Sequence, residues 1–188
     1  MAKRSRTAYA ILGFLTSGPR SGYDLKHEIE GSTGNFWQES YGQIYPILKK
    51  LTEEQLVKKS TASSGGRKRF EYTITAKGRR ALAGWLEEPA EPSPVRDELL
   101  LKVFFSAHVG DGVMHRQLED CRDRQLELLG RYRGIEEQLL RDHGGHPELD
   151  HWLLTVRFGE LYCQARLAWA EEALVKLAPP TKKRRKKS

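Results

Sequence analysis

Cysteine is scarce in this chain of 188 residues, and long apolar runs are absent from it. Cys121 and Cys163 lie far apart, with no Cys or His partner at the spacing of metal ligands. We therefore expect buried thiols, with no disulfide framework and no bound metal. No run approaches the roughly 20 apolar residues of a membrane span. The apolar stretch after the basic N-terminus, residues 9–16, is too short and too interrupted to predict a secretory signal.

Catalytic motifs are missing as well. The chain has no G-x-S-x-G sequence, phosphate-binding loop, dinucleotide fingerprint or paired His and Cys. We therefore expect a protein that is not an enzyme and needs no cofactor. Hydrophobic residues make up 38% of the chain, with four Trp and seven Tyr, which is enough for a folded core.

The net charge of +7 is distributed unevenly. Residues 1–88 hold 15 basic and 9 acidic side chains, residues 89–180 hold 11 and 16, and residues 181–188 hold six basic and none acidic. A basic front before an acidic middle indicates that one part of the chain meets a polyanion and the other does not. Residues 179–188 are predicted to be a disordered basic tail, either an arm that adds DNA affinity or a solubilising end.

Prolines at 89, 92 and 94 mark the clearest boundary, because proline cannot continue a helix. We predict a first domain over residues 1–88, a junction over 89–94 and a second domain over 95–178. The predicted fold class is mainly α, with a small β-hairpin.

The first domain is predicted to begin with three helices. Apolar residues recur at helical spacing over 7–17, 22–30 and 40–55. Ser21 is placed to cap the second helix and Gly31 to end it. Two β-type segments follow, over 56–61 and 69–74, and Thr75 caps a helix over 76–87. Three helices followed by a two-stranded hairpin predict a winged helix-turn-helix.

The second domain is predicted to be all helix, over 95–108, 111–141 and 149–177. Apolar residues spaced alternately three and four apart are typical of helices that pack as in a coiled coil. The last helix has two apolar stripes and so needs two partners, which we take to be an intrachain helix and a second subunit. This antiparallel helical dimerisation domain would use an interface of Leu149, Leu153, Val156, Leu167 and Leu174.

The third helix is the candidate for insertion into the major groove of double-stranded DNA. Its outward and flanking side chains are Tyr41, Gln43, Tyr45, Lys49 and Lys50. Gln43 is suited to pair with adenine, whereas tyrosines and lysines mostly contact phosphates. By itself this pattern also fits an ordinary solvated surface helix.

The predicted wing adds weight to the DNA-binding interpretation. Arg67, Lys68 and Arg69 directly follow two glycines at the hairpin tip, where cations can reach phosphates or the narrow minor groove. A run of charge is usually only a solvated loop. Its place after a helix-turn-helix pattern, in a basic domain, favours DNA binding.

Several sequence strings resemble the PadR family of bacterial transcriptional regulators. The most specific are Ser-Gly-Tyr-Asp over 21–24 and Tyr-Gly-Gln-Ile-Tyr-Pro-Ile-Leu over 41–48, and Ala-Arg-Leu-Ala-Trp over 165–169 is similar to the C-terminal helix of the longer branch. The resemblance is close over 7–88 and looser over 95–178. It departs at Gln55, where the family usually has glycine at the end of the recognition helix; the helix either strains here or runs one residue longer.

The resemblance implies a cytoplasmic, nucleoid-associated homodimeric repressor that binds a palindromic operator and is released by a small, aromatic or drug-like effector. It also implies that Ser40, Tyr41, Gln43 and Tyr45 belong to the DNA-reading helix, that Ser21 and Tyr23 make supporting backbone contacts, and that residues 67–69 form the wing.

Three weaker interpretations stay open. Trp152, Tyr162 and Trp169 are either an effector pocket or plain interface packing. The histidines at 143, 146 and 151 fit a solvated turn better than a metal site. In function, the alternatives to a repressor are an architectural DNA binder without sequence choice and a protein–protein adaptor that has lost DNA binding.

Overall fold

The computed structural model describes residues 5–34, 36–37, 41–64, 67–92 and 96–177. The chain divides into two compact units, residues 1–93 and 94–188, which are treated separately below. Within the described residues, helix predominates and a small antiparallel sheet accompanies it, which confirms the predicted fold class. No helix in this part of the chain combines the length and the apolar character needed to cross a membrane.

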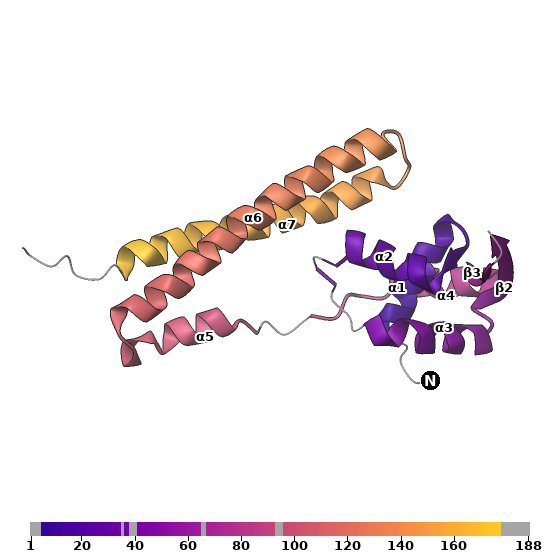
Figure 1. The fold of residues 1–188 in the computed structure, drawn as a ribbon, viewed down its shortest axis with the longest axis horizontal. Coiled ribbons are helices and arrows are strands. Elements are labelled where there is room, and N and C mark those ends of the chain that lie inside the picture. The colour runs from indigo at the N-terminus through magenta and orange to yellow at the C-terminus, as the bar shows by residue number, and fades with distance from the viewer. Residues whose placement is uncertain (1–4, 35, 38–40, 65–66, 93–95, 178–188) are drawn as a thin grey trace, which may run out of the picture. The chain divides into compact units, whose positions relative to one another are not determined.

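Unit 1 contains the predicted helices and hairpin (Figure 1). Its elements are α1 (Arg6–Phe14), a 3-10 turn (Leu15–Ser17), β1 (Arg20–Ser21), α2 (Gly22–Ser32), a 3-10 turn (Tyr41–Gln43), α3 (Ile44–Glu53), β2 (Val57–Ser64), β3 (Arg67–Ile74) and α4 (Ala76–Glu87). The hydroxyl of Thr75 accepts a hydrogen bond from the Gly78 N–H at 3.0 Å, which confirms the predicted cap of α4.

The sheet has one strand more than predicted. Its order is β1-β3-β2, with both pairings antiparallel. In β2 and β3, Lys59 lies opposite Tyr72 and Val57 opposite Ile74. In β1, Ser21 lies opposite Glu71. The two-residue strand β1 is too short to show a period in the sequence, yet it fixes the start of α2 to the middle of the hairpin.

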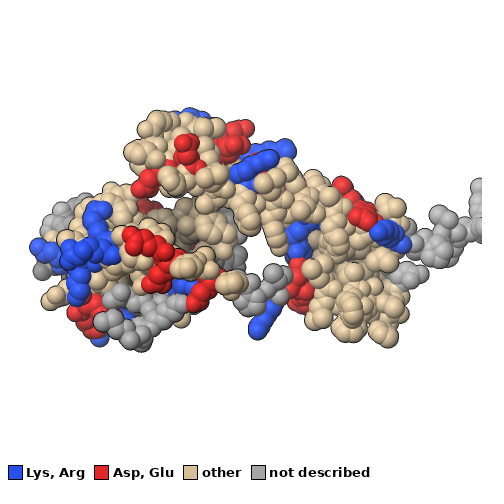
Figure 2. All heavy atoms as spheres, turned by 180° about the vertical axis from the view of Figure 1, so that it is seen from behind, with Lys and Arg blue, Asp and Glu red and all other residues tan. Residues whose placement is uncertain are grey.

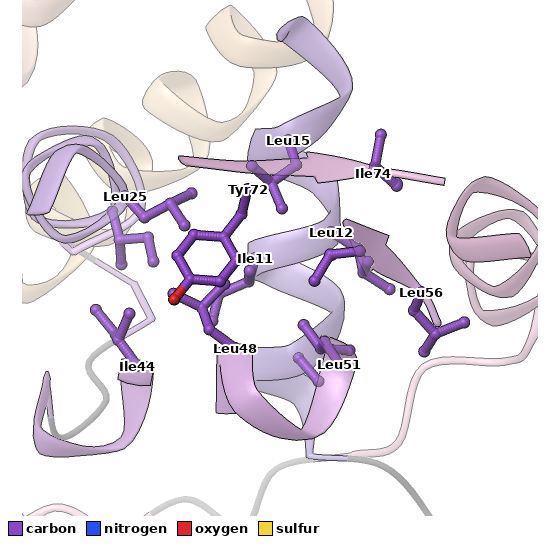
Figure 3. Close-up of a cluster of buried hydrophobic side chains, with 13 residues drawn as sticks. Ile11, Leu12, Leu15, Leu25, Ile44, Leu48, Leu51, Leu56, Tyr72 and Ile74 are labelled. Atoms are coloured by element: carbon purple, nitrogen blue, oxygen red, sulfur yellow. The ribbon is translucent and has the colours of Figure 1, made fainter. Parts of the chain in front are cut away.

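The core of unit 1 is one cluster in which every helix from α1 to α3 meets the sheet (Figure 3). Ile11 and Leu12 of α1 and Leu15 of the 3-10 turn after it are completely buried, and so are Leu25 and Leu48. Burying a leucine or isoleucine contributes ~1.5–3 kcal/mol, so these few side chains supply much of the stability of a unit this small. The core holds the outer faces of α3 and the hairpin in fixed positions.

Helix α2 begins where predicted but ends later. Ser21 and Asp24 form a reciprocal capping box at its start. The prediction that Gly31 stops the helix is wrong, because α2 continues to Ser32 and turns at Thr33. The N–H groups of Thr33 and Gly34 both donate to the carbonyl of Ile29. These two hydrogen bonds close the helix two to three residues beyond Gly31.

The chain leaves α3 through a residue in the left-handed conformation, two positions beyond the last helical residue, Glu53. Gln55 has φ +61°, and this is the position where the sequence departs from the family's glycine. The N–H of Leu56 bonds to the Leu51 carbonyl at 2.9 Å and that of Gln55 to the Thr52 carbonyl at 3.0 Å, the pairing of a Schellman end. The chain therefore tolerates strain at Gln55, and α3 does not run one residue longer.

Unit 2 is a hairpin of two long helices with a short helix before it. These are α5 (Glu98–Phe104), a 3-10 turn (Ser106–His108), α6 (Asp111–His143) and α7 (Leu149–Lys176). Figure 1 shows α6 and α7 side by side. Gly159 of α7 lies so close to the Tyr132 ring that an added Cβ would stand 2.2 Å from the ring, so the helices need glycine at this contact.

The inner seam of unit 2 corrects part of the predicted subunit interface. Val156 is 7% exposed and packs with Leu129, Tyr132 and Cys163 inside the chain, with Leu167 against the same cluster. Val156 was predicted to meet a second subunit, but it is buried against α6 of the same chain, whereas Leu167 is only half-buried. Leu149, Leu153 and Leu174 are half-buried.

The outer face of unit 2 carries the exposed apolar side chains instead. Leu154 and Phe158 of α7 are 70% and 67% exposed, and Phe104 of α5 is 79% exposed. Further exposed apolar or aromatic side chains lie on the same elements. In and after α5 they are Leu100, Leu101, Phe105 and Val109, and on α7 they are Leu161 and Tyr162. Exposed apolar surface on this scale in a small unit marks a surface that binds a partner.

We predict that replacing Gln55 with glycine raises the free energy of unfolding of unit 1 by up to ~1 kcal/mol, because glycine adopts positive φ without a clash at Cβ. Urea unfolding of the full chain measures the change. Gln55→Ala is the matched control, since it removes the same side chain but keeps Cβ. An equal gain from alanine would show that φ is not the cause.

Candidate nucleic-acid interface

Helix α3 presents a polar face opposite its buried stripe. Ile44, Leu48 and Leu51 face the core. Gln43 and Lys50 are exposed, as are Tyr45, with 62% of its side chain accessible, and Lys49, with 81%. The prediction of an outward row on this helix therefore agrees with the structure for these residues. Ser40 lies outside the described residues, and so does the side chain of Tyr41.

The Tyr45 side chain is exposed, but its rotation is restricted because its ring lies against α2. A Cβ added to Gly22 would meet Cε1 of Tyr45 at 2.6 Å, so glycine at the first position of α2 makes this close approach feasible. Burial raises the pKa of Tyr72, and Tyr45 beside it contributes in the same direction. The Tyr45 phenol is thus held near the sheet while its outer edge faces solvent.

The start of α2 is occupied by its own contacts. Ser21 is 4% exposed. Its hydroxyl donates to Oδ2 of Asp24 at 2.8 Å and accepts from the Asp24 N–H at 3.2 Å and from Nη2 of Arg69 at 2.6 Å. Tyr23 next to it is 59% exposed and packs edge-on against His27, with ring centroids 4.4 Å apart. Of the two predicted supporting contacts, Tyr23 is accessible and Ser21 is not.

The hairpin contributes an exposed pair that the sequence reasoning missed. The ammonium of Lys59 on β2 lies 3.7 Å from the centroid of the Phe70 ring on β3, and Phe70 is 52% exposed. A cation over an aromatic face is a favourable arrangement. Lys59 and Phe70 are diagonal neighbours, since Lys59 lies opposite Tyr72, two residues from Phe70. Such a pair can be recognised only when the register of the two strands is known.

The predicted basic cluster at the wing is only partly visible. The backbones of Arg67 and Lys68 belong to β3, and their side chains lie outside the described residues. Arg69 is described, and it points back to α2, where Nη2 lies 2.5 Å from Oδ1 of Asp24. Figure 2 shows a group of Lys and Arg side chains on unit 1.

The aromatic residues proposed for an effector pocket do not come together within the chain. Trp152 and Trp169 are 17 positions apart on α7, so a rise of about 1.5 Å per residue separates them by roughly 25 Å. Trp152 stacks on His146 at 4.6 Å, close to the turn after α6. One small ligand therefore cannot reach both tryptophans of a single chain, and the pocket of Trp152, Tyr162 and Trp169 stays a prediction.

Tyr162 instead belongs to a polar cluster around Arg166. The Arg166 guanidinium forms an ion pair with Asp97, which caps α5, and lies 3.3 Å from the Tyr162 hydroxyl and 3.9 Å from Sγ of Cys121. The hydrogen bond from Arg166 is the main cause that holds the pKa of Asp97 below its usual value. Burial raises the pKa of the Cys163 thiol, and the nearby charge of Arg166 only partly opposes it. Both cysteines are free and buried, as predicted.

Metal chemistry finds no support in the described part of the chain. No group of three or more His, Cys, Asp and Glu side chains there is arranged to hold an ion. His146 uses its Nδ1 to accept the N–H of Glu148 at 3.1 Å, so it stabilises the turn between α6 and α7.

Comparisons with known proteins agree with this architecture. Residues 11–84 match the model of the transcriptional regulator PadR-like family, and residues 95–178 match that of the virulence activator alpha C-terminal region. The negative transcriptional regulator PadR of Bacillus subtilis is 32% identical over an alignment of 156 residues, and the match covers 79% of this chain and 85% of that protein.

Two crystal structures of that Bacillus subtilis protein are similar over nearly their whole length. The complex with operator DNA has a TM-score of 0.81 at 28% identity and covers 92% of this chain and 99% of the other. The complex with p-coumaric acid has a TM-score of 0.75 at 28% identity and covers 92% and 98%. These relatives are regulators of transcription rather than enzymes.

Proposed function

Because this chain belongs to the PadR-like family of transcriptional regulators, we propose that it is a dimeric repressor that binds a palindromic operator in double-stranded DNA. The observation that carries the proposal is the exposed face of α3, held beside an accessible hairpin in a fold similar to a PadR bound to its operator. The localisation that goes with this role is the cytoplasm, at the nucleoid.

In the proposed complex, α3 enters the major groove, which is ~12 Å wide and admits one helix. Gln43 lies at the first turn and reads a base edge, with adenine the suited partner for its amide. Tyr45, Lys49 and Lys50 contact phosphates, and Tyr23 adds a contact from α2. Ser40, Tyr41, Arg67 and Lys68 complete the proposed interface.

Dimerisation uses unit 2 in this proposal. The apolar face of α5 and the stripe of Leu154, Phe158 and Leu161 on α7 are left 45–79% exposed by the described residues of the chain. A second copy buries the same face on both sides, as a two-fold interface requires. Two DNA-binding units related by two-fold symmetry match half-sites about one helical turn (~10 bp) apart or a multiple of it.

Release by a small aromatic molecule is the remaining part of the proposal. Its support is the complex of Bacillus subtilis PadR with p-coumaric acid. In this chain, Trp152 and Trp169 lie too far apart for one intrachain pocket, so the proposed effector site uses at most one of them from each subunit.

Footprinting and gel-shift on the DNA upstream of the chain's own gene test the function. We expect a bounded protected site, affinity that falls steeply with salt, and release by at least one member of a panel of aromatic acids that includes p-coumaric acid. Uniform coverage of the fragment would instead indicate an architectural binder. A flat plot of log K against log salt would indicate an adaptor that has lost DNA binding.

Alanine variants of Gln43 and Tyr45 are predicted to differ in kind. Gln43→Ala removes a base contact, so it relaxes discrimination at one base position at a cost of ~1–3 kcal/mol on the operator. Tyr45→Ala removes a phosphate contact, so it weakens operator and random DNA alike. Fluorescence anisotropy on both DNAs measures the difference. Equal losses for Gln43→Ala on the two DNAs would show that it does not read bases.

A charge on the exposed apolar face is predicted to separate the subunits. Phe158→Glu buries an unpaired carboxylate in the proposed interface, so the protein should sediment as a monomer at micromolar concentration. Leu86→Glu is the matched control, since Leu86 is 68% exposed on α4 in unit 1. If Phe158→Glu sediments as a dimer like this control, the α7 stripe is not the interface.

A further inference from the structure

Arg69 was expected to contact DNA because of its charge, but its side chain is already engaged. One nitrogen, Nη2, lies 2.5 Å from Oδ1 of Asp24 and 2.6 Å from Oγ of Ser21. These partners precede Arg69 by 45 and 48 residues, so the contact joins β3 of the hairpin to the first turn of α2. The guanidinium thus faces a carboxylate of the same chain, at a surface where the Arg69 side chain is 46% exposed and the Asp24 side chain 38%.

Ser21 and Asp24 hold each other in place through reciprocal hydrogen bonds in this arrangement. The Ser21 hydroxyl spends its single proton on Oδ2 of Asp24 and accepts from the Asp24 N–H and from Arg69. Oδ2 of Asp24 also accepts the Ser21 N–H at 3.1 Å, which leaves Oδ1 for Arg69. Burial opposes the charge on Asp24, but hydrogen bonds from Ser21 and Arg69 outweigh it and lower the pKa of its carboxyl.

The same turn of α2 also supports α3. Gly22, between Ser21 and Asp24, lies against the ring of Tyr45 on α3. The first turn of α2 therefore contacts the recognition helix on one side and the hairpin on the other. A change in the position of β3 relative to this turn changes the distance between the two elements that the proposed function places on DNA.

We propose that Arg69 is a positioning residue, which holds the wing at a fixed place relative to α3 through Asp24 and Ser21, and is not a phosphate contact. Only the expected effect of this link on DNA binding rests on the proposed function. The link itself is a property of the protein alone, so it is also testable without DNA.

Asp24→Asn distinguishes positioning from simple electrostatics. A carboxylate near DNA repels phosphate, so removing its charge should tighten binding if Arg69 acts only as a cation. If Arg69 positions the wing, the same variant loosens β3, and operator affinity falls by about tenfold, the size typical of coupled contacts. Fluorescence anisotropy on the footprinted operator measures this.

Glu28→Gln is the matched control. Glu28 is also on α2 and forms an ion pair with Arg20 at 2.5 Å, and its substitution removes one negative charge without touching the link to β3. We expect operator affinity equal to or slightly above that of the unchanged protein. Thermal melting of both variants shows whether the fold is retained.

Arg69→Gln gives the second readout, the salt dependence. Losing a phosphate contact lowers the slope of log K against log salt by about 0.9. We expect a change of slope well below this value, with an affinity loss similar to that of Asp24→Asn. The double variant should lose no more than either single variant, since both break one link.

Amide hydrogen exchange without DNA completes the experiment. Faster exchange in β3 of Asp24→Asn and Arg69→Gln, with β3 unchanged in Glu28→Gln, supports the proposal even if the protein binds no operator. Unchanged exchange in β3, affinity retained in Asp24→Asn, or a slope reduced by about 0.9 in Arg69→Gln would each overturn it.

Discussion

The proposed DNA-binding surface of unit 1 depends on the contacts made by the first turn of α2. Its capping box satisfies N–H groups that a helix start leaves without partners, and the carboxylate that closes the box also holds Arg69. Gly22 in the same turn lets the Tyr45 ring approach the backbone. Leu25, one residue beyond the turn, is completely buried and fixes it to the core. A short segment thus sets the relative positions of α3 and the hairpin.

Much of this unit follows from local sequence. The buried stripe of α3, the cap at Thr75 and the alternation in the hairpin depend on neighbours along the chain, so periodicity shows them. The strand β1 does not, since two residues have no period and its pairing with Glu71 and Tyr72 is tertiary. Arg69 shows the same limit for charge: sequence gives the sign, but only the fold shows that Asp24 lies opposite.

The second unit shows why an apolar stripe does not identify its partner. The seam through Val156 and Cys163 has the spacing of a subunit interface, yet α6 of the same chain covers it. The face that remains open is a different one, with Leu154 and Phe158. Both stripes are apolar at helical spacing, and the choice between them is decided by the turn that folds α7 back on α6. Distance along the helix likewise separates Trp152 from Trp169, although both belong to one stripe in the sequence.

Helix α5 links the proposed dimer to the rest of the protein. It has seven residues and none of them is buried, which is too little for a helix to be stable by itself. The cap and ion pair of Asp97 with Arg166 fix its start to α7, while Leu100, Leu101 and Phe104 have no apolar cover in the described chain. In the proposed dimer a second copy covers these side chains. In that proposed dimer, subunit association also stabilises α5 itself.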